Sequence, residues 1–234
     1  AGARLRLFRM LAIVGLPLLL VGTLELCLRI AGFGRPTTFF VPVTGSGLFT
    51  SNQSFGERFF PAPIARTPPV VVFEVPKPAP TFRVFVLGGS AAMGTPDATF
   101  GLSRHLQVIL DERYPERSIE VINAAMTAIN THVVRVIAKE CLRFEPDLLV
   151  VYAGNNEVVG PYGPGTVFDR FSGSGALVRA SIRLKGTRVG QLADRLMTRL
   201  EASAPRPGSW GGLSMFLDRR VEADDPRLAA VYGH

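Results

Sequence analysis

The first thirty residues carry a long run of apolar side chains. From Met10 to Leu24 no charged residue occurs, and the apolar character ends at Ile30. About 20 apolar residues in a helix are enough to cross the hydrocarbon core of a bilayer, so this stretch predicts one transmembrane helix. Glu25 and Arg29 interrupt the end of the run four residues apart, and we expect them to pair at the membrane interface.

Basic residues flank this helix unevenly. Three arginines precede the run and one lies at its end, which favours a cytoplasmic N-terminus. We therefore expect a single-pass protein of the inner membrane with its folded part in the periplasm. A cleaved signal peptide shares the basic start and the apolar core, but residues 25–30 are bulky and charged and make a poor cleavage site. A buried core helix is disfavoured by Pro17 and by apolar residues all round the helix.

Strand-like and helix-like patterns alternate in the middle of the chain. Short apolar runs at 82–87, 118–123 and 147–152 predict strands, and the spacing of apolar residues at 100–114 and 132–144 predicts helices. This order, with short connections, is typical of right-handed βαβ units and a parallel sheet. The third strand is almost wholly apolar, so we expect both faces of the sheet to be covered. The predicted core positions of the two helices are Leu102, Leu106, Ile109, Leu110, Val133, Val136, Ile137, Cys141 and Phe144.

The segment between the apolar helix and the first strand is rich in proline and aromatic residues. Nine prolines between residues 36 and 80 exclude long helices. Apolar clusters at 39–41 and 70–73 predict extended pieces, and the composition is too apolar for a disordered linker. We interpret residues 1–31 as a membrane anchor and residues 32–80 as an extended arm that lies on the following domain or on a partner.

The last third of the chain is basic. Residues 176–200 predict an amphipathic helix, with leucines at helical spacing and arginines around them. We interpret residues 164–220 as a basic helical insertion within a domain that spans 81–234, with a loop rich in proline and glycine at 204–212. A solvated surface face explains such a helix, and contact with lipid head groups or an acidic partner is the sharper hypothesis.

Charge and cysteine content narrow the function classes. The formal net charge is +7, which fits binding to nucleic acid, binding to an anionic membrane surface, or solubility alone. No nucleic-acid motif accompanies the charge, and we expect no nucleic-acid partner. Cys27 and Cys141 lie in separate predicted helices, so no disulfide is expected. No cluster of histidine, cysteine and aspartate at ligand spacing occurs, so we expect no metal and no other cofactor.

Polar turns of small residues follow the three predicted strands, at 88–94, 123–131 and 153–157. Because the carboxyl ends of parallel strands meet at one edge of a sheet, we expect these turns to converge on one crevice. The first turn is not G-x-G-x-x-G, since Ser90 occupies the second glycine position, and it lacks the lysine of a phosphate loop. It is not the G-x-S-x-G elbow either, because Ala92 replaces the last glycine. A nucleotide- or flavin-binding domain thus fits the sheet but not the turns.

The three turns together resemble the sequence blocks of the SGNH (GDSL-like) hydrolases. Residues 88–94 resemble the G-D-S-x-x-x-G block with Gly89 in place of the aspartate, and residues 123–128 resemble the N-x-x-x-x-G block with Ala128 in place of the glycine. Residues 154–157 resemble the G-x-N-D block. The resemblance covers about a third of the chain and implies a flavodoxin-like, three-layer α/β fold behind the membrane helix.

The resemblance also implies a role for each matching residue. Ser90 would be the nucleophile, at the start of a helix. The backbone N–H groups of Ser90 and Ala128 and the side-chain amide of Asn155 would form the oxyanion hole. A methyl group at position 128 disfavours the positive φ that glycine accepts, so we expect some distortion of the hole. Candidate substrate contacts at the same edge are Asn130, His132 and Asn156.

The family's Asp-x-x-His, which supplies the catalytic base, does not occur in this sequence. None of His105, His132 and His234 has an aspartate three residues before it. Asp225 and Pro226 predict the start of another helix close to residue 234. We therefore expect the natural protein to continue beyond this residue, with the base in the added part.

Two functions stay open at this stage. The first is a membrane-anchored, periplasm-facing esterase or acyltransferase that acts on acyl esters of envelope glycans or lipids. The second is a non-catalytic accessory subunit of a larger inner-membrane complex, in which the SGNH-like domain serves as a scaffold. Ser90 and Asn155 favour the enzyme, whereas Gly89, Ala128 and the missing base favour the scaffold.

Overall fold

The computed structural model describes residues 2–166 and 175–200, together with positions 214, 221, 222, 224–226 and 228. The chain divides into two compact units. One unit holds residues 1–35 and 179–205, and the other holds residues 36–178 and 206–234. The loop expected at 204–212 and most of the helix expected from Pro226 lie outside the described residues.

The first unit contains the apolar N-terminal helix. Helix α1 spans Gly2–Ile30, and its part Ala12–Ile30 is long and apolar enough for one membrane span. A signal sequence would satisfy the same criteria of length and composition. The expected pair forms near its end, where the guanidinium of Arg29 lies 2.7 Å from the carboxylate of Glu25.

The basic segment forms two helices, so the prediction of a single helix over 176–200 is wrong. Helix α5 spans Gly175–Lys185 and helix α6 spans Arg188–Leu200. Thr187 produces the break, because its hydroxyl donates to the carbonyl oxygen of Leu184 at 2.8 Å and accepts the N–H of Gly190 at 2.9 Å. This side chain therefore satisfies a backbone group at the start of α6, which favours a new helix there.

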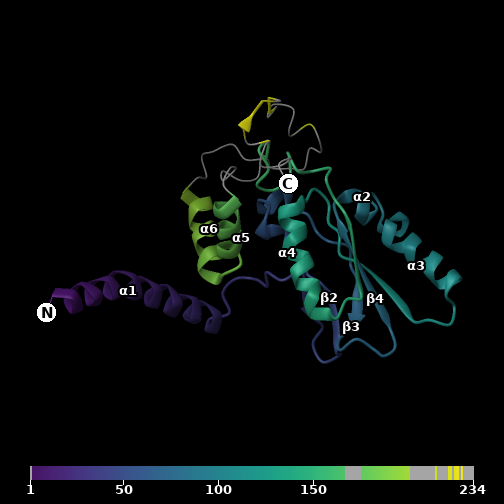
Figure 1. Ribbon diagram of the computed structural model, residues 1–234, viewed down its shortest axis with the longest axis horizontal. Coiled ribbons are helices and arrows are strands. Elements are labelled where there is room, and N and C mark those ends of the chain that lie inside the picture. The colour runs from purple at the N-terminus through teal and green to yellow at the C-terminus, as the bar shows by residue number, and fades with distance from the viewer. Residues whose placement is uncertain are drawn as a thin grey trace. The chain divides into compact units, whose positions relative to one another are not determined.

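A parallel sheet forms the centre of the second unit. Its strands are β4 (Phe82–Gly88), β5 (Ile119–Asn123) and β6 (Leu148–Tyr152), in the order β5-β4-β6. Helices α2 (Ser90–Met93), α3 (Leu102–Arg113) and α4 (Thr131–Cys141) accompany it (Figure 1). The three strands and the two longer helices lie where the apolar pattern predicts them. In α4 and the turn after it, the side chains of Val133, Ile137, Cys141 and Phe144 are buried as expected.

The expectation that both faces of the sheet are covered along the third strand is wrong for the described residues. Strand β4 is buried from Arg83 to Gly88. In β6, by contrast, Leu148, Val151 and Tyr152 are 47%, 58% and 50% exposed. The strands differ in exposure because of their positions in the sheet. Among the residues that the structure describes, β6 is an edge strand, whereas β4 has a neighbouring strand on each side.

Helix α3 buries only part of the predicted face, where Leu106 packs against the core as expected. Leu102 and Ile109 are 38% and 60% exposed rather than buried. Gln107 faces the sheet instead, where its amide donates to the carbonyl oxygen of Ile119 at 2.9 Å and accepts the N–H of Val121 at 2.7 Å. These two bonds satisfy backbone groups of β5, and they turn the helix so that part of its apolar stripe faces outward.

The proline-rich arm folds into a sheet of its own. Strands β1 (Phe40–Pro42), β2 (Leu48–Ser51) and β3 (Val72–Glu74) pair antiparallel in that order. The ring of Phe40 contacts those of Phe73 and Phe144 edge to face, with centroids 4.9 and 5.4 Å apart, and lies 5.9 Å from that of Phe85 in β4. These aromatic contacts join the antiparallel sheet to the parallel one.

The guanidinium of Arg83 links the same elements from within. It is fully buried, and its Nε lies 2.7 Å from the carboxylate of Glu120 in β5. Its two terminal nitrogens donate to the carbonyl oxygens of Phe144 at 3.1 Å and Glu74 at 2.8 Å. The group also lies 5.1 Å from the ring centre of Phe73. One side chain of β4 thus contacts both sheets and the turn after α4.

Replacing this arginine tests how much the junction stabilises. We expect Arg83→Met to lower the free energy of unfolding by about 3–5 kcal/mol, because it leaves the carbonyl groups of Phe144 and Glu74 without this donor and Glu120 without its cation. Arg117→Met removes an exposed arginine paired with Glu116 and should change stability by less than about 0.5 kcal/mol. Urea unfolding followed by circular dichroism measures both, and equal losses would contradict the assignment.

Glu140 of α4 joins this helix to the arm. Its carboxylate accepts the N–H groups of Phe39 at 2.8 Å and Phe40 at 2.9 Å. Burial raises the pKa of Glu140 above its ordinary value, although these two hydrogen bonds and the guanidinium groups of Arg143 and Arg58 act in the opposite direction. The folded protein therefore holds this proton to a higher pH than the unfolded chain does.

This raised pKa has a consequence for stability. The contribution of Glu140 is complete below its ordinary pKa of 4.5 and is lost as the pH rises through the raised folded-state value. We expect the melting temperature of Glu140→Gln, relative to wild type, to increase between about pH 4 and about pH 7. The exposed neighbour provides the control, since Glu145→Gln should keep the wild-type pH dependence. A Glu140→Gln variant with an unchanged pH profile would contradict this account.

Candidate functional site

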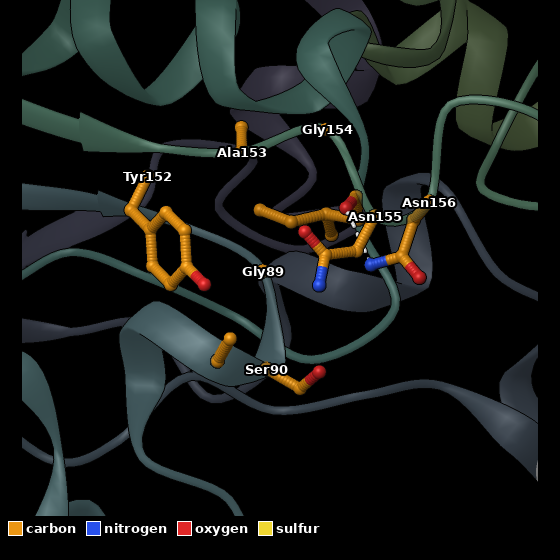
Figure 2. Close-up of a pocket in the computed structure, with 9 residues that line it drawn as sticks. Gly89, Ser90, Tyr152, Ala153, Gly154, Asn155 and Asn156 are labelled. Atoms are coloured by element: carbon orange, nitrogen blue, oxygen red, sulfur yellow. Dashed lines mark hydrogen bonds between the residues drawn. The ribbon is translucent and has the colours of Figure 1, made fainter.

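The turns after the three parallel strands meet at a small hollow. It lies at the carboxyl end of the sheet and takes residues from all three turns (Figure 2). The expected convergence on one place is therefore present. The residues that line the hollow are Gly89, Ser90, Ala91, Ile129, Tyr152, Ala153, Gly154, Asn155 and Asn156.

The first turn brings Ser90 to the edge of the hollow. Gly88 precedes it with φ +156°, and a Cβ at Gly88 would lie 1.9 Å from the carbonyl oxygen of Tyr152, so only glycine allows β4 and β6 to approach this closely. Ser90 is the first residue of α2 and is half-buried. Its hydroxyl makes no hydrogen bond with any described residue, which leaves both its proton and its lone pairs available.

The second turn is fixed to the first by Asn123. Its amide donates to the carbonyl oxygen of Met93, at the end of α2, at 3.0 Å, and its oxygen accepts the N–H of Ala125 at 3.2 Å. Further along this turn Ala128 has φ +64°, the left-handed conformation that glycine adopts easily. The methyl group of Ala128 therefore does not force the backbone out of the left-handed region.

The third turn contributes two asparagine amides. The amide nitrogen of Asn156 donates to the carbonyl oxygen of Ile129 at 3.0 Å. A Cβ at Gly89 would lie 3.0 Å from this nitrogen, so glycine at position 89 leaves room for the Asn156 side chain. Asn155 is exposed and makes no hydrogen bond with a described residue. Figure 2 shows its amide turned into the hollow, towards Gly89 and Ser90.

Glu157, the last residue of the third block, has a structural contact. Its carboxylate accepts the N–H of Thr131 at 3.1 Å and the hydroxyl of the same residue at 2.6 Å. Thr131 begins α4, so the carboxylate lies at a helix N-terminus, where a negative charge is favourable. The bond ties the third turn to the second.

Two of the predicted substrate contacts lie away from the hollow. Asn130 is 1% exposed, and its amide donates to the carbonyl oxygen of Pro161 at 2.9 Å. The ring of His132 is half-buried and packs edge to face against Tyr162, with centroids 6.3 Å apart. Ser90, Asn155 and Asn156 line the hollow, whereas these two residues do not. Tyr152 lines it without having been predicted, and its place at the end of an apolar strand is the only sequence signal for it.

No described histidine, cysteine or acidic residue lines the hollow. The ring of His105 lies within hydrogen-bonding distance, at 3.1 Å, of the carbonyl oxygen of Gly101, which directly precedes α3. Cys27 and Cys141 are free thiols, and burial raises the pKa of the Cys141 thiol, which makes it a poor nucleophile. The described residues also contain no group of three or more histidine, cysteine, aspartate and glutamate side chains that could hold a metal ion.

Comparison with known proteins gives no information about the function of this hollow. The scan against protein-family models and the searches of curated proteins and of solved structures gave no match. Assignment of a function therefore depends on the three turns and on the side chains that they bring together.

The backbone conformation at Ala128 is testable by a matched pair of substitutions. We expect Ala128→Gly to raise the free energy of unfolding by about 0.5–1 kcal/mol, because it relieves the cost of the left-handed conformation. The same change at the neighbouring buried Ala124, whose φ is not positive, should lower it by about 1 kcal/mol through lost burial and backbone entropy. Urea unfolding measures both, and effects of the same sign would contradict the assigned conformation.

Proposed function

We propose that this protein is a membrane-anchored, periplasm-facing esterase or acyltransferase of the SGNH type, acting on acyl esters of envelope glycans or lipids. Acetyl groups on polysaccharide are the favoured substrate. The observation that carries the proposal is that Ser90, Asn155 and Asn156 line one hollow at the carboxyl end of the parallel sheet. A flavodoxin-like, three-layer fold for the whole domain is part of the same proposal.

The proposed reaction is acyl transfer in two steps. The Ser90 hydroxyl oxygen attacks the ester carbonyl carbon, its proton passes to a base, and the alcohol leaves with a proton to give acyl-Ser90. Water or a second hydroxyl group then takes the acyl group. The backbone N–H groups of Ser90 and Ala128 and one asparagine amide, of Asn155 or Asn156, donate to the oxyanion in both steps. Among the described residues that line the hollow are the nucleophile Ser90 and both of these asparagines, but no base, and Ala128 itself does not line it.

Either Asn155 or Asn156 could donate the side-chain hydrogen bond to the oxyanion. The amide of Asn155 makes no hydrogen bond with a described residue and is turned into the hollow (Figure 2). Counted from Gly154, however, the G-x-N-D block has its asparagine at position 156. The Asn156 amide uses one hydrogen on the carbonyl oxygen of Ile129 and keeps a second. Replacing each in turn decides which residue donates.

The location proposed for the site depends on α1. We take Ala12–Ile30 as a span of the inner membrane, with the N-terminus in the cytoplasm because arginines cluster before it. The ion pair between Glu25 and Arg29 supports this placement, since charged residues at the end of a span belong at the membrane interface. The parallel sheet would then face the periplasm.

Acylation of Ser90 is the direct test. We expect the full chain in detergent micelles, treated with p-nitrophenyl acetate, to gain one acetyl group on the peptide that contains Ser90, as measured by mass spectrometry. Ser90→Ala should abolish this product, and the exposed Ser118→Ala should not. Loss of the donating asparagine should slow acylation about 10²–10³-fold, and loss of the other should have a much smaller effect. Equal acylation of the Ser90→Ala chain would refute the proposal.

One observation favours the second candidate function, a non-catalytic accessory subunit. A serine hydroxyl without a base is a weak nucleophile, and Ser90 has no hydrogen-bond partner among the described residues. If Ser90 stays unmodified, the domain serves as a scaffold for a larger inner-membrane complex. Cross-linking of the protein in its native membrane would then recover partner subunits in fixed stoichiometry.

A further inference from the structure

A carboxylate within the apolar helix α1 binds the start of helix α6. The Glu25 carboxylate accepts the backbone N–H of Val189 at 2.9 Å and the Nε–H of Arg29 at 2.8 Å. Val189 is the second residue of α6, so the carboxylate meets N–H groups that the helix itself leaves unpaired. The positive end of the helix dipole favours this contact.

The chain that leaves α1 holds α6 over a longer stretch. The amide of Gln191 accepts the N–H of Arg35 at 3.0 Å and donates to its carbonyl oxygen at 3.2 Å. The guanidinium of Arg188 donates to the same carbonyl oxygen. Further along the helix, the guanidinium of Arg195 lies 4.5 Å from the ring centre of Phe33. Helix α6 is therefore attached to the end of α1 through several residues of both.

These contacts fix the depth at which α6 begins. Glu25 precedes the last residue of α1 by five positions, which is about 7–8 Å along the helix axis. A carboxylate is costly in the centre of a bilayer, so Glu25 belongs at the interface where α1 leaves the apolar layer. The first turn of α6 is bonded to Glu25 and lies at the same depth.

The surface of α6 is suited to such an interface. Its apolar side chains Leu196, Met197 and Leu200 are 49%, 53% and 81% exposed. On the helical period, Thr198 lies about opposite Leu196 and Leu200, and Asp194 lies beside Thr198 and Met197. Arg195 and Arg199 lie along the other edge of the apolar side. Residues 179–200 contain six basic residues and one acidic residue. A helix with one apolar side and basic residues beside it is the kind that lies on anionic membranes.

We propose that α6 is an interfacial helix that docks on the anionic lipid head groups of the periplasmic leaflet. Leu196, Met197 and Leu200 enter the boundary between head groups and acyl chains, and Arg199 of α6 and the exposed Arg183 of the preceding helix α5 contact the lipid phosphates. The inference rests on the membrane span of the proposed function and goes beyond it by assigning a second lipid contact. We favour lipid over a protein partner for two reasons. The basic residues complement anionic head groups, and hydrogen bonds hold α6 to the end of the membrane helix α1.

A matched pair of fluorescent labels on α6 tests the proposal. The full chain carries Cys27→Ser, so that Cys141, which is buried, is its only native thiol. A cysteine-reactive nitrobenzoxadiazole probe is placed at Leu196→Cys or at Thr198→Cys, in vesicles of phosphatidylcholine with or without phosphatidylglycerol. We expect the emission at position 196, and not at 198, to shift to the blue and to be quenched by spin-labelled lipid when phosphatidylglycerol is present.

A third label separates this proposal from the membrane span. A probe at Leu19→Cys, in the middle of α1, should be quenched in every vesicle composition. If it is quenched while positions 196 and 198 behave alike, α1 spans the bilayer and the docking of α6 is refuted. A blue shift at position 196 without quenching by lipid would mean that protein covers this face, and it would overturn the proposal as well.

Charge variants test the selection of anionic lipid. Each basic residue near an anionic surface contributes enough to change the ratio of docked to undocked helix about fivefold. We therefore expect Arg183→Gln with Arg199→Gln to reduce quenching at position 196 in vesicles that contain phosphatidylglycerol and to leave it unchanged in phosphatidylcholine alone. Asp194→Asn removes the one acidic residue within 179–200 and serves as the control. This change should not reduce quenching at position 196. Quenching that is insensitive to the arginine changes would refute the role of anionic head groups.

Discussion

The buried guanidinium of Arg83 is the constraint on which the second unit depends. A charge in the interior is tolerated only when its donors are satisfied, and here the partners belong to β3, β5 and the turn after α4. These elements must therefore be in place together. Arg83 stands in β4, the strand that leads to Ser90, so the same bonds that attach the arm also fix the base of the hollow.

Short polar side chains link the three turns that form the hollow. Asn123 ties the second turn to the first, and Asn156 and Glu157 tie the third to the second. Such bonds fix backbone N–H groups before any ligand arrives, which is what an oxyanion site requires. Ser90 and Asn155 stand apart from this network, because their side chains have no partner among the described residues.

The sequence predicts where the helices and strands lie better than it predicts which of their side chains are buried. Apolar spacing located the strands and longer helices of the parallel sheet, because that spacing follows from the geometry of each element alone. It did not show which face of α3 is buried, since two backbone bonds of Gln107 decide that orientation. For the site, the pattern named Ser90, Asn155 and Asn156, which line the hollow, but also Asn130, whose burial depends on contacts far along the chain.

If α1 spans a membrane as proposed, the bond between Glu25 and the backbone of α6 has a consequence for how α1 responds to the bilayer. A span whose length does not match the bilayer can slide, tilt or deform the lipid around it. Sliding inward by one turn would draw the carboxylate and the end of α6 towards the hydrocarbon, and sliding outward would lift the apolar side of α6 into water. Once α1 lies in a bilayer, its vertical position is therefore set by a side-chain bond as well as by hydropathy, and changes in thickness are met by tilt.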